Sequence, residues 1–393
     1  MIEKIRGGVC APAGFFCGSI PCGIKDPKVA RDDVALLISE KPCTSAATFT
    51  TNLVKAAPVQ VSMEHLKSGN IRGVILNSGN ANACTGAKGL ADARSMAAAA
   101  AKRTGLTPEQ ILVCSTGRIG VAMPIDRIGA GLAGIRLSRR GSSNCAKAIM
   151  TSDTFPKEVA FGVESEAGTF RIGAIAKGAG MINPNMATML CVITTDASVP
   201  QPALRVALRA AVEKSFNRIT IDGDMSTNDT VILLANGESG VNPPLAQFQE
   251  ALDSSSKALA RMIVEDGEGA SRFVEVEVRG AASAGDARRA AEAVANSTLV
   301  KCAWAGGDPN WGRIMDALGY SGARMLEEKT DIWYGDLPIV ERGAMAGTPL
   351  AKLKAVAESR EFCVRIDLSL GEFSHTVWTT DLTEEYVRLN LGE

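Results

Sequence analysis

Short apolar runs alternate with stretches of helical spacing along most of this chain. Residues 1–60 hold apolar runs broken by Gly and Pro, and VALLIS, AATFTT and AAPVQVS predict strands and turns. The same reasoning predicts a hairpin within residues 150–176 and strands at residues 71–76, 111–115, 189–195, 231–234, 273–278 and 362–368. Apolar residues at helical spacing predict helices at residues 90–103, 202–216, 245–265 and 287–295. This mixture indicates a layered α/β fold.

Length and charge narrow the possible classes of protein. With 393 residues, 46% of them hydrophobic, the chain is large enough for two lobes, and residues 237–244 are a candidate boundary. The net charge of -1 gives no electrostatic case for binding nucleic acid or an anionic membrane. No apolar run approaches the roughly 20 residues that span a bilayer, and the N-terminal residues lack the apolar stretch of a signal peptide. We therefore expect a cytoplasmic protein.

Cysteine and histidine usage argues against several kinds of active site. The ten cysteines are scattered without a CxxC pair, and several lie in apolar runs, which is typical of reduced core cysteines and not of a zinc site. The two histidines are His65, expected on a helical surface, and His375, expected in an alternating strand. No GxSxG occurs, so a nucleophilic enzyme built on this chain would use a base other than histidine.

The segment of residues 177–196, KGAGMINPNMATMLCVITTD, carries the strongest indication of chemistry. A Gly-rich bend and an Asn-Pro turn precede the step from Ala187 to Thr188, which leads into an apolar run. If the Ala187–Thr188 peptide bond breaks, Thr188 gains a free amine beside its own hydroxyl, which is one way to activate a threonine nucleophile. The alternative is a β-branched residue at the start of a strand, where threonine is common.

Four further residues have both a chemical and a structural interpretation. Thr116 and Gly117 follow the strand ILVCS, where backbone N–H groups could form an oxyanion hole or simply an ordinary βα turn. Lys177 could anchor a carboxylate or be a solvated lysine before a turn. Glu268, in EDGEGA, could bind a substrate ammonium or belong to an acidic turn that ends a helix.

Two polar segments have ordinary structural explanations. Residues 216–230 are dense in Asp and Asn, but their spacing does not fit an EF-hand, so turn chemistry and internal hydrogen bonds are expected of Asp222, Asp224, Asn228 and Asp229. The segment GGDPNWGRI predicts a loop that enters a helix with Asp308 or Asn310 as its cap. Its glycines match neither the dinucleotide nor the Walker fingerprint.

Taken together, these motifs resemble one family, the ornithine acetyltransferases of arginine biosynthesis, also called glutamate N-acetyltransferases. The resemblance extends almost from end to end, through APAGFFCGSIPCGIK, TFTTNLVKAAPV, NSGNANACTG, STGRIG, MTSDTFPK, KGAGMINPNMATMLCVITTD, FNRITIDGDMSTNDT, EDGEGA, GGDPNWGRI and DLTEEYVRLN. So many long motifs in one order are specific, and they favour the interpretation of Thr188 as a nucleophile.

The resemblance implies a layered α/β fold of the kind shared with self-processing aminopeptidases and similar to N-terminal-nucleophile hydrolases. It implies that the precursor cleaves itself between Ala187 and Thr188 into an α fragment, residues 1–187, and a β fragment, residues 188–393, which assemble as an α2β2 heterotetramer. Thr188 would take the acetyl group of N-acetylornithine, release ornithine and pass the acetyl group to glutamate. No metal or bound cofactor is implied. Some family members also use acetyl-CoA as a donor, and no residue here decides that question.

The resemblance also assigns roles to particular residues. Thr116 and Gly117 match the oxyanion positions of the family. The positions that match its substrate contacts are Thr151, Lys177, Thr188, Glu268 and Asn390.

Two departures and two alternatives remain. Arg118 stands where the family usually has an aliphatic residue, and it could face solvent or alter substrate preference. The chain ends at LNLGE, soon after Asn390, where family members commonly continue to a terminal threonine that contacts substrate. A self-processing aminopeptidase or amidohydrolase of the same fold would release product to water, although SGNANACTG and GGDPNWGRI favour the acetyltransferase. A non-enzymatic binding protein of this fold would tolerate loss of the Thr188 hydroxyl.

Overall fold

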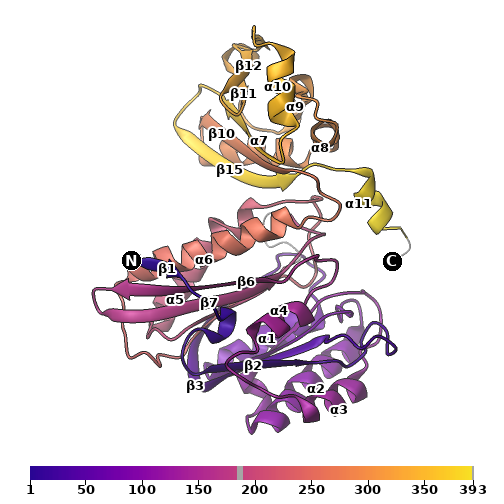
Figure 1. The fold of residues 1–393 in the computed structure, drawn as a ribbon, viewed down its shortest axis with the longest axis vertical. Helices are drawn as coiled ribbons and strands as arrows, with labels where there is room; N and C mark the ends of the chain where they lie inside the picture. The colour runs from indigo at the N-terminus through magenta and orange to yellow at the C-terminus, as the bar shows by residue number, and fades with distance from the viewer. Residues whose placement is uncertain (184–188, 392–393) are drawn as a thin grey trace. The chain divides into compact units, whose positions relative to one another are not determined.

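The computed structural model describes residues 1–183 and 189–391, and the chain divides into two compact units (Figure 1). The first unit holds residues 1–217 and 225–263, and the second holds residues 218–224 and 264–393. The boundary therefore lies near the end of α6 (Leu245–Glu265), so the expected boundary at residues 237–244 is wrong. The reason is that α6 packs on the first unit. The centroid of the Phe248 ring, on α6, lies 6.2 Å from that of Phe170, on β7.

In the first unit, the described residues form a nine-stranded sheet in the order β1-β6-β7-β8-β9-β3-β4-β5, with β2 paired to β3. The pairs β4/β5 and β8/β9 are parallel, and the others are antiparallel. The predicted run VALLIS lies within β3, and the first four residues of AATFTT form its end. The strand bounds are β1 (Ile2–Lys4), β2 (Phe15–Ile20), β3 (Val34–Phe49), β4 (Ile71–Asn77), β5 (Ile111–Ser115), β6 (Lys157–Ser165), β7 (Gly168–Lys177), β8 (Leu190–Thr195) and β9 (Thr230–Ala235).

Helices cover the strands of this unit on both faces (Figure 1). The α-helices besides α6 are α1 (Ala57–His65), α2 (Gly86–Thr104), α3 (Ile125–Gly134), α4 (Ser142–Ala148) and α5 (Gln201–Glu213). Short 3₁₀ helices are η1 (Gly8–Cys10), η2 (Leu66–Ser68), η3 (Pro108–Gln110) and, at the boundary of the units, η4 (Phe216–Arg218).

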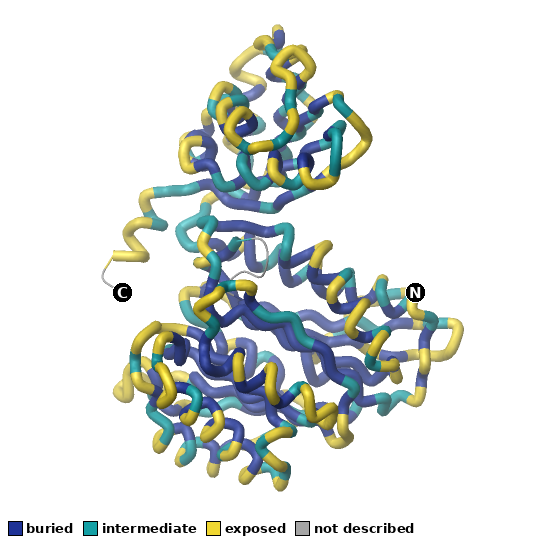
Figure 2. The backbone as a smooth tube through the Cα atoms, turned by 180° about the vertical axis from the view of Figure 1, so that it is seen from behind, coloured by how far each residue is buried: buried dark blue, intermediate teal, exposed yellow. Residues whose placement is uncertain are grey.

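The period-two alternation of the strands divides the apolar residues of this unit between two cores. In β4, Val74 and Leu76 face a cluster that includes residues of α4, whereas Ile75 faces a cluster formed with α1, α2 and α3. The central strands are buried along most of their length (Figure 2). Strands buried on both faces explain why these segments appear in the sequence as continuous apolar runs.

One expected strand is a helix. The segment AAPVQVS begins α1, with Pro58 in the first turn, where its missing N–H leaves no hydrogen bond unmade. This helix packs on β5, and Ser62 donates a hydrogen bond to the carbonyl of Val113 over 2.7 Å. His65 is therefore buried and not on a helical surface as expected, and its Nδ1 lies 2.7 Å from the carbonyl oxygen of Ile111.

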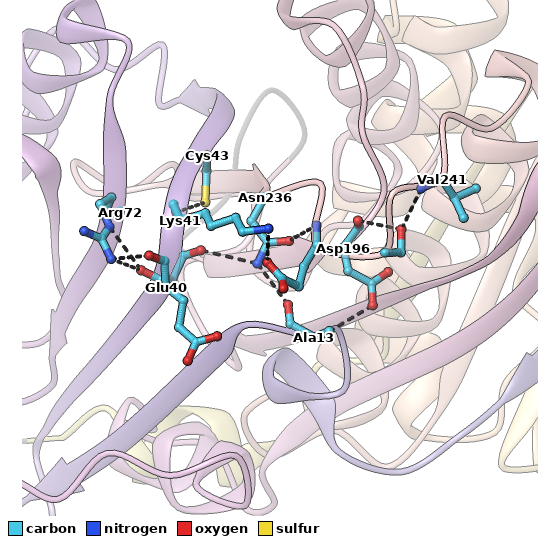
Figure 3. A network of polar contacts seen from close by, with 11 residues as sticks. Ala13, Glu40, Lys41, Cys43, Arg72, Asp196, Asn236 and Val241 are labelled. Atoms are coloured by element: carbon cyan, nitrogen blue, oxygen red, sulfur yellow. Dashed lines mark hydrogen bonds and ion pairs between the residues drawn. The ribbon is translucent and has the colours of Figure 1, made fainter.

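A polar network fixes the carboxyl ends of β8 and β9 (Figure 3). Asp196 accepts hydrogen bonds from the backbone N–H groups of Ala13 and Arg171, over 2.9 and 2.7 Å. The side-chain amide of Asn236 donates to the carbonyl of Ala13 over 2.9 Å. These hydrogen bonds connect Ala13, which precedes β2, to Asp196 and Asn236, which follow the central strands β8 and β9.

The second unit has its own sheet, in the order β13-β12-β11-β14-β10-β15. Its strands are β10 (Phe273–Ala281), β11 (Asp331–Tyr334), β12 (Leu337–Glu341), β13 (Ala344–Met345), β14 (Glu361–Asp367) and β15 (Phe373–Thr380). Its helices are α7 (Ala284–Asn296), α8 (Thr298–Ala305), α9 (Trp311–Tyr320), α10 (Leu350–Ala357), α11 (Glu384–Leu389) and the 3₁₀ helix η5 (Glu327–Lys329). Asn310, one of the two expected caps of α9, accepts a hydrogen bond from the Arg313 N–H.

The layered α/β fold predicted from the sequence is confirmed by these two sheets and their helices. Most of the cysteines are buried, as expected, and burial raises the pKa of the Cys114 thiol to about 12, which disfavours the reactive thiolate. Among the described helices, none combines the length and the apolar character needed to cross a membrane.

Replacing Trp304 with Ala should lower the free energy of unfolding of the second unit by about 3–5 kcal/mol. The substitution removes the largest fully buried side chain and leaves a cavity in the core. It also removes the hydrogen bond from the indole N–H to the Tyr334 hydroxyl, 3.2 Å long. Denaturant unfolding measures the change. Leu299→Ala, on the exposed face of the same helix, should change the free energy of unfolding by about 0.5 kcal/mol or less, and equal effects would contradict this account.

Candidate active site

The loops that follow the parallel strands β4 and β5 lie side by side. Asn77 and Ser115 are register partners at the ends of these strands, and the N–H of Thr116 donates to the carbonyl of Asn77 over 3.0 Å. Asn80, in the loop after β4, forms β-bridges with both Thr116 and Arg118. The segments NSGNANACTG and STGRIG, far apart in the sequence, thus form one structural unit.

Asparagine side chains hold this pair of loops together. The Asn77 side-chain amide donates to the carbonyl of Asn80 over 2.9 Å. The Asn228 side-chain amide, from the polar segment before β9, donates to the carbonyls of Ala81 and Ser115, over 2.7 and 2.9 Å. The expectation of internal hydrogen bonding in residues 216–230 is confirmed by the N–H of Asp224, which donates to Asp222, and by the N–H of Asn228, which donates to Ser226. These bonds satisfy buried carbonyls that regular secondary structure leaves unpaired.

Gly117 can be replaced by no other residue without movement of the backbone. Its φ is +129°, and an added Cβ would lie 2.3 Å from the carbonyl carbon of Gly79 and 2.4 Å from the nitrogen of Asn80. Because the N–H of Thr116 is bonded to Asn77, the donors left to stabilise an oxyanion here are the Thr116 hydroxyl and the Gly117 N–H. Only one of the two backbone N–H groups considered from the sequence can therefore serve.

Lys177 is buried at the end of β7, so its interpretation as a solvated lysine is wrong. Its Nζ lies 3.4 Å from the hydroxyl oxygen of Thr116. The fold thus brings together two of the residues singled out in the sequence. A buried ammonium is costly unless anionic groups lie near it.

One anionic group that interacts with Lys177 is Asp153, which sequence reasoning missed. One carboxylate oxygen accepts hydrogen bonds from Lys157 Nζ and the Gly178 N–H, over 2.7 and 2.8 Å, and the other accepts from the Thr151 N–H over 2.9 Å. Burial opposes the charge of Asp153, but the ammonium groups of Lys177 and Lys157 outweigh it and lower the pKa of the carboxyl to about 2. The carboxylate therefore stays ionised at neutral pH.

Asp229 is a second buried carboxyl group at this end of the sheet. It precedes β9, and its Oδ1 accepts a hydrogen bond from the Met189 N–H over 3.0 Å. Burial raises the pKa of Asp229 well above its ordinary value, although the bond from Met189 and the charge of Lys177 oppose the shift. Ala187 and Thr188, the cleavage site and nucleophile expected from the sequence, lie outside the described residues.

The second unit brings together Glu268 and Asn390. The side-chain amide of Asn390, at the end of α11, donates to a carboxylate oxygen of Glu268 over 2.9 Å. The EDGEGA turn packs against α11, because Gly269 has a φ of +65° and an added Cβ there would lie 2.4 Å from the Tyr386 nitrogen. Glu268 is thus part of a fixed side-chain pair and not only of a solvated turn.

Arg118 lies on the surface beside Gly117. Its side chain is exposed and donates to the carbonyl of Lys25 over 3.2 Å. This contact favours the interpretation that its charge faces solvent. Over the part of the chain that the structure describes, no group of three or more His, Cys, Asp and Glu side chains is arranged to hold a metal ion.

Comparison with known proteins identifies the family. The profile of the ArgJ family matches residues 16–392. The chain belongs to the ArgJ family. An ArgJ-family relative, the arginine biosynthesis bifunctional protein ArgJ of Symbiobacterium thermophilum, is 48% identical over 99% of both chains. The glutamate N-acetyltransferase of Methanocaldococcus jannaschii is 46% identical, again over 99% of both. A crystal structure of the arginine biosynthesis bifunctional protein argJ from Bacillus halodurans is 38% identical, covers 51% of this chain and 97% of that one, and has a TM-score of 0.49.

Membership of the ArgJ family confirms the resemblance drawn from the motifs. It also confirms the expectation of an enzyme of the acyltransferase class, because the Methanocaldococcus jannaschii relative, which matches over 99% of both chains, is a glutamate N-acetyltransferase by name. Membership of the family does not by itself assign roles to individual residues.

Gly117→Ala should destabilise the protein by about 2–4 kcal/mol, because it adds a backbone clash to an unfavourable φ. Gly120→Ala is the matched control. Gly120 also has a positive φ, +76°, but nothing lies within 4 Å of an added Cβ, so a cost of about 1–2 kcal/mol is expected. Urea unfolding of both variants checks the difference, and equal losses would show that the contact with residues 79 and 80 is unimportant.

Asp153 should make the free energy of unfolding depend on pH in acid. Its pKa of about 2 in the folded protein is below the ordinary value, so its contribution is complete above about pH 4 and is lost as the pH falls towards 2. The shift corresponds to about 2 kcal/mol. The difference in free energy of unfolding between wild type and Asp153→Asn should narrow by that amount from about pH 5 to about pH 2. A difference that stays constant over this range would contradict the assignment.

Proposed function

We propose that this enzyme transfers an acetyl group from N2-acetyl-L-ornithine to L-glutamate in arginine biosynthesis. The observation that carries the proposal is the buried Lys177 ammonium 3.4 Å from the Thr116 hydroxyl, next to Gly117. A cation and oxyanion donors side by side suit a substrate that has both a carboxylate and an acyl carbonyl. The names of the relatives support the same reaction, since they include a glutamate N-acetyltransferase.

The nucleophile in this proposal is Thr188, made available by self-cleavage after Ala187. Cleavage gives an α fragment, residues 1–187, and a β fragment, residues 188–393, which remain associated as an α2β2 heterotetramer. The new amine of Thr188 has a reference pKa of about 7.7–8.0, so a useful fraction is neutral near neutral pH and can accept the hydroxyl proton. No histidine is needed as the base.

The reaction then has two halves that share one site. In the first, Thr188 Oγ attacks the acetyl carbonyl, the Thr116 hydroxyl and the Gly117 N–H stabilise the oxyanion, and ornithine leaves with the proton taken from the hydroxyl. In the second, the α-amine of glutamate attacks the acetyl ester, N-acetylglutamate leaves, and the proton returns to Thr188 Oγ. No metal or bound cofactor takes part, and acetyl-CoA is a candidate second donor.

Charge placement selects the substrates. Lys177 holds the α-carboxylate that ornithine and glutamate have in common, with Thr151 beside it. Glu268, with Asn390 as its partner, receives the side-chain ammonium of ornithine. Glu268 is a half-buried residue, and the described hydrogen bond to its carboxylate comes from a neutral amide, which leaves its charge for the ligand in this proposal.

The second candidate is a self-processing aminopeptidase or amidohydrolase that uses the same threonine and releases its acyl group to water. The two functions differ in the acceptor. With N-acetylornithine as donor, the transferase should form N-acetylglutamate in step with ornithine, whereas a hydrolase should form acetate at a rate that glutamate does not change. Chromatography of the products with and without glutamate distinguishes them.

Self-cleavage is testable by intact mass under denaturing conditions. The wild type should give two fragments that divide before residue 188, and Thr188→Ala should give one uncut chain, because the attacking hydroxyl is gone. A single uncut wild-type chain would mean that the threonine amine is never freed.

Thr116→Val should lower kcat for acetyl transfer by about 10²–10³-fold, because it removes one donor to the oxyanion while keeping the shape of the side chain. Thr104→Val, on α2, is the matched control and should transfer at the wild-type rate. Rates are referred to the cleaved fraction measured by mass. Equal rates for the two variants would exclude the Thr116 hydroxyl from the oxyanion site.

A further inference from the structure

Helix α11 has no buried side chain to anchor it. None of its six residues is buried, and the helix extends from the rest of the second unit (Figure 1). A helix of this length is unstable by itself, so contacts with other segments must fix its place. Its place matters for the site, because Asn390 directly follows α11 and is the hydrogen-bond partner of Glu268.

Tyr386 connects α11 to two other segments. Its hydroxyl donates to a carboxylate oxygen of Asp222 over 3.2 Å, and its backbone nitrogen would lie 2.4 Å from a Cβ added at Gly269. Its carbonyl accepts a hydrogen bond over 2.9 Å from the side-chain amide of Asn390, which also donates to Glu268. One tyrosine thus fixes α11 against the turn that carries Glu268.

Thr383, directly before α11, holds the same turn. Its hydroxyl donates to the carbonyl of Gly269 over 2.6 Å. Nearby, Asp381 accepts hydrogen bonds from the N–H groups of Ser271 and Arg272, over 2.8 and 3.0 Å. The backbone that follows Glu268 is therefore fixed by the chain that leads into α11.

The Tyr386 hydroxyl stays protonated at neutral pH. Burial raises the pKa of Tyr386, and the nearby carboxylates of Asp222, Glu268 and Asp224 raise it further. The hydroxyl is therefore available as a donor to Asp222. The described hydrogen bond to Glu268 comes from a neutral amide, which fixes the carboxylate without cancelling its charge. A carboxylate held in this way is suited to bind a cation.

We propose that Tyr386 and Thr383 are positioning residues that select the side-chain ammonium of ornithine through Glu268. Tyr386 holds the amide partner of Glu268, and Thr383 holds the backbone that follows it. Asp222, expected from the sequence to take part in turn chemistry, is the anchor for Tyr386. This inference rests on the proposed function for the role of Glu268. It adds that discrimination between a cationic and an uncharged side chain depends on the anchoring of an exposed helix.

Tyr386→Phe removes the hydroxyl and keeps the ring, so it should weaken ammonium binding selectively. The affinity for ornithine should fall by about fivefold or more, the effect of losing one hydrogen bond. The affinity for norvaline, which has the same side chain without its amine, should change by less than about twofold. Thr383→Val should act in the same direction. The KM for N-acetylornithine should rise with the loss of affinity, while kcat stays within about threefold, because neither residue contacts a reacting atom.

The experiment measures binding of ornithine and of norvaline to the purified full chain by calorimetry. Tyr386→Phe and Thr383→Val are each made alone and together with Glu268→Gln. Once the charge of Glu268 is gone, loss of either hydroxyl should have no further effect on the ratio of the two affinities. Tyr320→Phe is the matched control, because it removes the hydroxyl of an exposed tyrosine at the end of α9 in the same unit. The control should keep the wild-type preference for ornithine over norvaline.

A selective loss of ornithine affinity that disappears in the Glu268→Gln background supports the proposal. An unchanged preference in folded Tyr386→Phe, or an equal loss of affinity for both ligands, overturns it. A selective loss that persists in the Glu268→Gln background also overturns it, since the hydroxyl would then act by another route. If Tyr386→Phe does not fold, Thr383→Val decides by the same comparison. Failure of the proposed function looks different: the wild type would then show no preference for ornithine over norvaline, or would form no N-acetylglutamate.

Discussion

The burial of one ammonium group, that of Lys177, is the constraint on which the rest of this site depends. A charged group at the end of a buried strand must be compensated, and the chain does so with a carboxylate that has a second lysine of its own. The Lys177 ammonium itself lies 3.4 Å from the Thr116 hydroxyl. In the proposed function, this buried ammonium binds the carboxylate of the substrate beside the Thr116 hydroxyl.

The loops around this charge are built for rigidity. Gly117 approaches the backbone at residues 79 and 80 so closely that no side chain fits, and Asn228 fixes the carbonyls of Ala81 and Ser115. These hydrogen bonds pair backbone carbonyl groups in the loops that follow β4 and β5, where no sheet partner is present. Preorganised donors of this kind are what stabilisation of a transition state requires, because they need no rearrangement at the moment of reaction.

Much of the fold could be predicted from local patterns, but burial at the site could not. The long helix at residues 245–265 and the hairpin that holds Lys177 follow from periodicity, and the motif order identified the family. The segment AAPVQVS begins a helix where a strand is predicted, because proline is favoured in the first turn of a helix. His65 is buried, contrary to the prediction of a helical surface, because α1 packs on β5. The ion pair of Asp153 and Lys157 was missed because its burial depends on tertiary packing, which also brings the N–H of Gly178, after β7, to Asp153. No local signal in MTSDTFPK marks them as buried.

The central claim is that an acetyl group is held on Thr188 between donor and acceptor. The most direct test is to mix the purified enzyme with N-acetylornithine labelled in the acetyl group, quench in acid without glutamate, and map the labelled peptide by mass spectrometry. The account predicts one acetyl group on the peptide that begins at Thr188, discharged when glutamate is added before the quench. Label on another residue, or turnover with no labelled peptide at any time, would contradict it.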